Sequence, residues 1–218
     1  DEINYFSTSV MNYPVAIKEP DEEVITSWEH PKFLYISDYI GNIENLLETD
    51  KEELAHWKEI QEMIDVDSYI DWWIIHELGT NWEPDHPKSS YMFKKGEGKL
   101  YAGPVWDFDW GTFSPSWNRA SLTHTIWYGY FFRYPEFKAA VKERWSEIRE
   151  PLEGIDEYIL EKAAYLQESN EVNLHKWPIT TNMNVNGDAF INYEKAINRM
   201  SSSYVNMLNI IDTYITNL

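Results

Sequence analysis

Apolar side chains recur every three or four residues along several long stretches of the chain, and this spacing constrains the fold most. An α-helix turns once in about 3.6 residues, so the spacing places the apolar side chains on one helix face, which has to be buried against a neighbour. The stretches that show it are 33–47, 54–64, 69–78, 137–148, 155–166 and 190–211. The chain is therefore predicted to be mainly helical.

Residues at the ends of these stretches predict where some of the helices begin and end. Thr49, followed three residues later by Glu52, matches a capping box at the start of the second helix. Asp67 is the predicted N-cap of the third helix, and Gly79 its predicted left-handed C-terminal residue.

The rest of the chain predicts a small amount of β-structure. Residues 91–94 and 100–102 flank Gly96-Glu97-Gly98, which is typical of a β-hairpin, and residues 13–17 predict a short strand or loop. The aromatic-rich segment 113–134 predicts an irregular structure. We expect an α+β, mainly helical fold, with residues 1–218 forming one domain.

Composition excludes several classes of function. The formal net charge is −19, which argues against direct binding of nucleic acid because phosphate contacts need clustered Lys and Arg. No apolar run reaches the roughly 20 residues that a membrane span requires. The chain contains no cysteine, which excludes disulfides, thiolate metal sites and thiol catalysis.

Two carboxylates stand two residues apart between large aromatic residues near the middle of the chain. If this segment is a strand, Trp106, Phe108 and Trp110 point into the core while Asp107 and Asp109 share the opposite face. Adjacent carboxylates in an apolar setting remain ionised only when a cation or basic groups offset their charge, and Mg²⁺ prefers such oxygen ligands. The alternative is a strand with one solvated face.

A second polar segment, the loop 81–90, contains two prolines and no helical period. The predicted hairpin joins this loop to the paired aspartates, so the two segments are expected to frame one cleft. The cleft suits metal-assisted phosphoryl transfer, and a hydrolase with paired carboxylates is also compatible with it. The loop would contribute Asn81, Glu83, Asp85, His86 and Ser90.

An ordered series of short motifs resembles the spore coat protein H (CotH) kinase family. The series comprises residues 65–71, 77–81, 91–94, 98–100 and 103–109, and the helical tail matches it at 135–137, 144–149 and 177–178. The resemblance covers roughly residues 10–215. Each motif is weak alone, but their order is specific.

The resemblance implies an atypical protein kinase, with a distant protein-kinase-like C-terminal lobe, that transfers the γ-phosphate of ATP to Ser or Thr of a protein substrate. It implies Mg²⁺ or Mn²⁺ at Asp107, with Asp109 beside it, and a location at the cell surface or in the spore coat. It also implies that a nucleotide-binding N-terminal lobe would precede residue 1, so that the isolated chain would be inactive.

Two positions depart from the pattern of the family. Glu83 stands where relatives carry the catalytic aspartate of an Asn-x-Asp loop that begins here at Asn81, and Ser90 stands where they carry a metal-binding Asn. Asp85 could replace the aspartate. The departures favour an alternative, a non-catalytic, pseudokinase-like binding module. A carbohydrate-active enzyme with two carboxylates across a sugar cleft is a third possibility.

Overall fold

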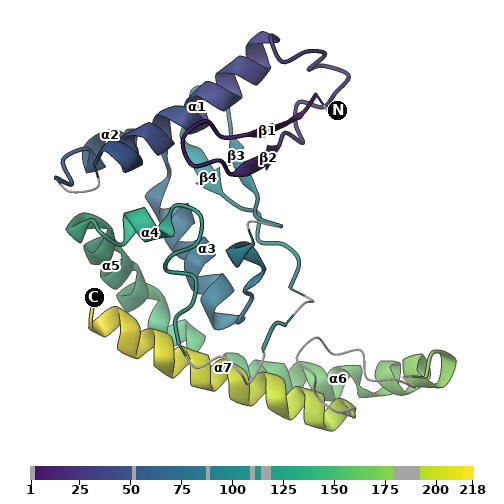
Figure 1. Ribbon diagram of the computed structural model, residues 1–218. Coiled ribbons are helices and arrows are strands. Elements are labelled where there is room, and N and C mark those ends of the chain that lie inside the picture. The colour runs from purple at the N-terminus through teal and green to yellow at the C-terminus, as the bar shows by residue number, and fades with distance from the viewer. Residues whose placement is uncertain (1–2, 51–52, 87–88, 109–110, 114–118, 179–191) are drawn as a thin grey trace.

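The computed structural model describes residues 3–50, 53–86, 89–108, 111–113, 119–178 and 192–218, and it has the mainly helical α+β architecture that the sequence predicts (Figure 1). The strands are β1 (Tyr5–Ser7), β2 (Pro14–Ala16), β3 (Met92–Lys94) and β4 (Leu100–Ala102). The helices are α1 (Pro31–Thr49), α2 (Trp57–Met63), α3 (Val66–Leu78), α4 (Tyr128–Phe131), α5 (Pro135–Leu152), α6 (Ile155–Lys176) and α7 (Tyr193–Thr216), and residues Glu83–Asp85 form a short 3₁₀ helix, η1.

Helix α3 lies at the centre of the molecule, between the layer of α1 and α2 and the layer of α6 and α7 (Figure 1). It packs against α5, α7 and β4. Its side chains are buried on most sides, including Tyr69, Ile70 and Trp73, which are at most 1% exposed. A helix that is apolar around most of its circumference belongs in the interior of a core. The last turn of α3 therefore gives a rigid base to the loop that follows it.

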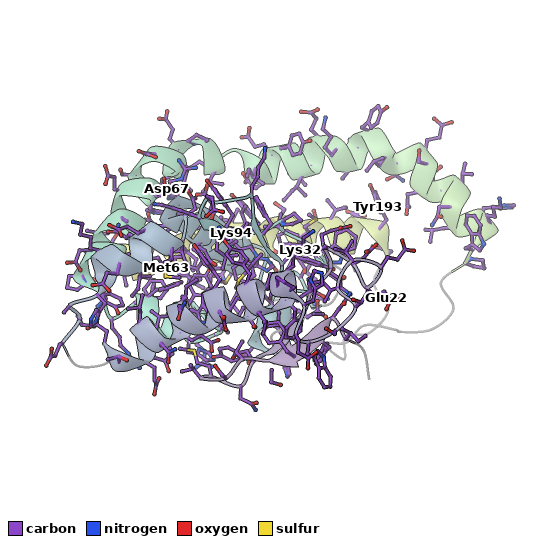
Figure 2. All side chains as sticks on the ribbon, turned by 90° about the horizontal axis from the view of Figure 1, so that it is seen from above. Glu22, Lys32, Met63, Asp67, Lys94 and Tyr193 are labelled. Carbon is purple, nitrogen blue, oxygen red and sulfur yellow. The ribbon has the colours of Figure 1, made fainter. Side chains whose placement is uncertain are left out.

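Helices α6 and α7 pack along each other, but α6 extends beyond the body of the molecule (Figure 2). The predicted apolar stripe of α6 is buried only near its start: Ile159 is buried, whereas Leu166 is 48% exposed. The stripe predicts the helix correctly but overestimates how much of it reaches the core.

The named strands of the described residues form two separate antiparallel hairpins. The predicted β3–β4 hairpin is confirmed, with Met92 opposite Ala102 and a left-handed Gly96 in its turn. The strand expected at 13–17 is β2, and it pairs with β1 in a second hairpin that was not predicted. Three-residue strands carry too little alternation to be recognised in the sequence alone.

The predicted helix ends are partly wrong. Asp65, not Asp67, caps α3: its carboxylate accepts a hydrogen bond from the Ser68 N–H at 3.0 Å. Gly79 has an ordinary right-handed conformation (φ −74°), and the left-handed residue is Thr80 (φ 52°). Helix α3 therefore begins two residues earlier than predicted, and the left-handed residue that follows it lies one position later than predicted.

The capping box predicted at Thr49 is also wrong. Thr49 is the last residue of α1, and Glu52 lies outside the described residues. The buried Asp50 acts instead: its carboxylate accepts from the N–H groups of Ala55 and His56 at 2.6 and 2.7 Å, just before α2. An aspartate with two oxygens holds the turn between the helices more firmly than a threonine hydroxyl would.

In the described part of the chain, no helix combines the length and the apolar character that crossing a membrane requires.

Candidate functional site

The segment that follows β4 is not the strand that the sequence predicted. Pairing with β3 ends where the Gly103 N–H donates to the Tyr91 carbonyl at 2.8 Å, and beyond this point no described strand accompanies the chain. Trp106 is 56% exposed instead of buried, and Asp107 has a left-handed backbone (φ 66°). Alternation across a strand therefore does not position these side chains. Trp110 and Asp109 lie outside the described residues.

Both ends of the loop 81–90 are nevertheless hydrogen-bonded to Asp107. The Asn81 side-chain amide donates to the Asp107 backbone carbonyl at 3.0 Å. The Ser89 hydroxyl donates to Asp107 Oδ2 at 2.9 Å. Asn81 and Ser89 are therefore both tied to this aspartate, and Glu83 and Asp85 lie between them in the chain.

Three residues of this arrangement have left-handed backbones although none is glycine. Thr80, Ser89 and Asp107 have φ values of 52°, 51° and 66°. Such conformations cost on the order of 1 kcal/mol each and persist only where the surrounding structure imposes them, which is frequent at functional sites. Their concentration around one carboxylate marks this region of the surface as a candidate site.

A stack of aromatic rings packs against the segment that contains Asp107. The Phe108 ring lies 4.7 Å from the His76 ring, which in turn lies 4.0 Å from the Trp72 indole. Gly79 permits the close approach of Phe108, because a Cβ there would lie 3.0 Å from Phe108 Cε1. This stack connects the acidic segment to the buried end of α3.

His76 is buried in this stack and is 1% exposed. Neither ring nitrogen makes a well-formed hydrogen bond with a described residue. Burial lowers the pKa of His76 to about 4, and the nearby backbone of Asn81 offsets part of that effect. His76 is therefore neutral at neutral pH and acts as a packing residue.

The two acidic candidates in η1 differ in their surroundings. The Glu83 backbone N–H donates to Asn81 Oδ1 at 3.3 Å, and its carboxylate oxygen Oε2 is buried without a partner among the described residues. Asp85 is more open: its side chain is 44% exposed, and Oδ1 lies 3.1 Å from His124 Nε2. Asp85 is thus the more accessible carboxylate.

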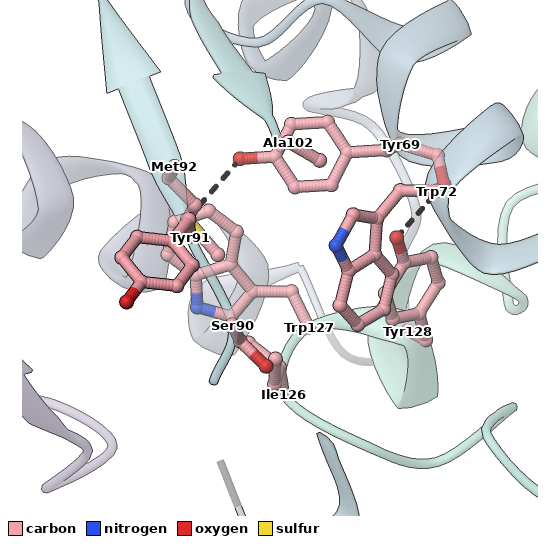
Figure 3. Close-up of a pocket in the computed structure, with 9 residues that line it drawn as sticks. All are labelled: Tyr69, Trp72, Ser90, Tyr91, Met92, Ala102, Ile126, Trp127 and Tyr128. Atoms are coloured by element: carbon pink, nitrogen blue, oxygen red, sulfur yellow. Dashed lines mark hydrogen bonds between the residues drawn. The ribbon is translucent and has the colours of Figure 1, made fainter. Parts of the chain in front are cut away.

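Ser90 lines a small aromatic pocket next to the site (Figure 3). The pocket lies between α3, the β3–β4 hairpin and the start of α4, and the indole nitrogen of Trp72 faces into it without a hydrogen-bond partner among the described residues (Figure 3). The neighbouring Ser89 donates to the Asp107 carboxylate. The other lining residues are Tyr69, Tyr91, Met92, Ala102, Ile126, Trp127 and Tyr128.

With this geometry established, comparison with known proteins assigns the family. A family model described as CotH kinase protein matches residues 8–217. The chain belongs to the CotH kinase family. No curated protein and no solved structure shows significant similarity to it.

The donors at the site of this CotH-family chain suit a hard divalent cation. Asp107 offers a partly exposed carboxylate, and Ser89 offers a hydroxyl. Mg²⁺ usually takes one or two carboxylates, and water and substrate phosphates complete its coordination. In the described residues, no group of three or more acidic or His side chains is assembled that would bind a metal by itself.

Two arginines of α5 form ion pairs with aspartates of neighbouring helices. Arg144 pairs with Asp71 at 2.7 Å, and Arg149 pairs with Asp212 at 3.2 Å. These contacts join α5 to α3 and to α7.

Three residues that shape the site were missed in the sequence. Ser89 and His124 belong to loops without a period, so only the folded chain brings them to Asp107 and Asp85. Glu77 was overlooked because it lies in the middle of an apolar helix. Its carboxylate accepts hydrogen bonds from the Trp73 indole (3.1 Å) and from the N–H groups of Ser121 (3.0 Å) and Leu122 (2.7 Å). Glu77 thereby fixes the segment that leads to His124.

Proposed function

We propose that this CotH-family chain takes part in phosphoryl transfer from ATP to Ser or Thr hydroxyls of a protein substrate, with Mg²⁺ or Mn²⁺, at the cell surface or in a spore coat. Membership of a kinase family supports the reaction class. In phosphoryl transfer, the protein mainly positions the reactants and offsets phosphate charge, so a few carboxylates in a fixed arrangement are sufficient.

The observation that carries the proposal is the double attachment of the loop 81–90 to Asp107. Hydrogen bonds from Asn81 and Ser89 join Asp107, the carboxylate proposed to bind the metal, to the loop that contains two candidate bases, Glu83 and Asp85. Catalysis of phosphoryl transfer depends mainly on positioning of this kind, and a misplacement of the reacting groups by about 1 Å reduces the rate by about two orders of magnitude.

We assign the following roles. Asp107, together with Asp109, holds the metal, and Ser90 contributes to the nucleotide side of the site. The metal would neutralise charge on the phosphate oxygens. Asn81 orients the loop, and the segment that contains Glu83 and Asp85 forms the proton-accepting side of the site.

Nucleotide binding tests this proposal directly. Replacing Asp107 with Ala, in the chain together with any flanking sequence that its gene encodes, should abolish Mg²⁺-dependent ATP binding measured by isothermal titration calorimetry. Asp67→Ala is the matched control, because Asp67 is an exposed aspartate in the first turn of α3 (Figure 2). Unchanged ATP affinity in Asp107→Ala would refute the assignment.

A second candidate function is a non-catalytic, pseudokinase-like binding module. One observation favours it: the residue at the catalytic position is Glu83, and its oxygen Oε2 is buried and unpartnered among the described residues, so this oxygen is not open to a substrate. A transfer assay with γ-³²P-ATP and Mg²⁺ or Mn²⁺ separates the two. ATP binding without transfer supports the binding module.

A further inference from the structure

The geometry points to an Asp85–His124 pair as the proton-accepting unit of the site. This inference deepens the proposed function and rests on it. We infer that His124 Nδ1 takes the proton of the acceptor hydroxyl and that Asp85 holds the imidazole ring. His124 is then a catalytic residue, and Asp85 is a positioning residue.

The first support is the contact between the two side chains. His124 Nε2 lies 3.1 Å from Asp85 Oδ1, which is a hydrogen-bonding distance. A carboxylate can only accept, so an imidazole nitrogen this close to Asp85 Oδ1 is the protonated one, which places the proton of a neutral ring on Nε2. Nδ1 is then left as an acceptor, because the partner of one ring nitrogen determines the tautomer of the other.

The second support is accessibility. The side chains of His124 and Asp85 are 69% and 44% exposed, so a hydroxyl of a protein substrate can reach them. The alternative base, Glu83, has its Oε2 buried. A base has to come within about 3 Å of the proton that it removes, so the open pair is the better candidate.

The third support is that both partners are attached to fixed parts of the fold. Asp85 lies in η1, inside the loop that Asn81 and Ser89 tie to Asp107. The segment before His124 is held by Glu77 through the Ser121 and Leu122 N–H groups. The base and the metal-type carboxylate are therefore positioned by the same central helix, α3.

The fourth support is the packing of the His124 backbone. Gly129, in α4, lies against it, and a Cβ on Gly129 would be 3.4 Å from the His124 carbonyl oxygen. The main chain of His124 is thus confined although its ring faces solvent. A confined main chain with an open ring suits a residue that has to meet a substrate.

The chemical step is balanced as follows. A lone pair of the substrate hydroxyl oxygen forms a bond to the γ-phosphorus of ATP, and the bond between the γ-phosphorus and the β,γ-bridging oxygen breaks, so its electron pair leaves with ADP. The hydroxyl proton moves to His124 Nδ1, and the imidazolium then releases a proton to solvent. The Asp85 carboxylate stabilises the imidazolium without becoming protonated.

The kinetic test compares His124→Ala with His175→Ala, in which an exposed histidine near the end of α6 is replaced. For His124→Ala we expect kcat to fall about 100-fold or more while the KM for ATP stays within about twofold, and added imidazole to restore at least about tenfold of the loss. His124→Gln keeps a donor for Asp85 but has no basic nitrogen and should be equally slow. Wild-type kcat in either His124 variant, or a slow His124→Ala that imidazole does not rescue, would overturn the proposal.

A second measurement does not depend on activity. Imidazole ¹⁵N chemical shifts should show His124 in the Nε2–H form in the wild type, and a loss of that preference in Asp85→Ala. An Nδ1–H form in the wild type would overturn the pairing. Absence of any transfer by the wild type would refute the proposed function and the base role together, and the ¹⁵N shifts would still decide the pairing.

Discussion

Replacing Glu77 with Gln should change how the stability of the protein depends on pH. Glu77 is 1% exposed, and burial raises its pKa to about 7 from an ordinary value of 4.5, although hydrogen bonds from Ser121, Leu122 and Trp73 oppose this. Each pKa unit corresponds to about 1.4 kcal/mol, so burial of the ionised form costs about 3 kcal/mol relative to the protonated form. With so little exposure, solvent screens little of this energy.

The direction follows from proton binding. Between pH 4.5 and about 7, the folded protein holds the Glu77 proton while the unfolded chain has lost it. The free energy of unfolding that this group contributes is therefore fully present below pH 4.5 and is lost as the pH rises through 7. Glu77→Gln removes this titration.

The assay is urea unfolding at half-unit intervals from pH 4.5 to 8. The wild-type free energy of unfolding minus that of Glu77→Gln should fall by about 3 kcal/mol across this range. Glu97→Gln is the control: it replaces an exposed glutamate in the β3–β4 turn and should give a difference below about 0.5 kcal/mol at every pH. A Glu77→Gln difference that is constant with pH would refute the argument that burial dominates this carboxylate.

Two further predictions concern stability. The variant His76→Phe keeps an aromatic ring against Trp72 and removes a group whose pKa burial lowers from 6.5 to about 4. The free energy of unfolding of this variant, relative to that of the wild type, should therefore increase by about 3 kcal/mol as the pH falls from 7.5 to 4. Urea unfolding at the two pH values measures this difference. No relative gain in acid would contradict this. Asp50→Ala should lower the free energy of unfolding by at least about 3 kcal/mol, because it leaves the buried hydroxyl of Tyr134 and the N–H groups of Ala55 and His56 without their acceptor. A loss below about 1 kcal/mol would contradict this.

The helical part of the fold could be predicted because it rests on local periodicity. The stripes beginning at Phe33 and Phe137 correspond to α1 and α5, and a proline two residues earlier begins each helix. The β3–β4 hairpin was predictable for the same reason, since its strands flank a glycine-containing turn. The ends of α3 were mispredicted because Asp65 and Asp67 are both plausible caps, and only the fold selects between them.

The strand predicted around Asp107 was wrong for a different reason. Alternating aromatic and acidic residues are typical of a strand, but a strand exists only where a partner is available, and the pairing with β3 ends at Ala102. The position of Asp107 is set instead by Asn81, by Ser89 and by the packing of Phe108 on His76. Contacts of this kind join residues far apart in the chain and leave no periodic signal.

The sequence by itself determined the helical class, the hairpin and the family, since each depends on residues that are close together or on motifs in a fixed order. Only the tertiary structure decided which polar groups meet. It placed the Ser89 hydroxyl on the Asp107 carboxylate, and it brought His124 to Asp85 across 39 positions of the chain. The physical reason is that α3 holds all these loops through its buried side chains, and burial of that kind is a property of the whole fold.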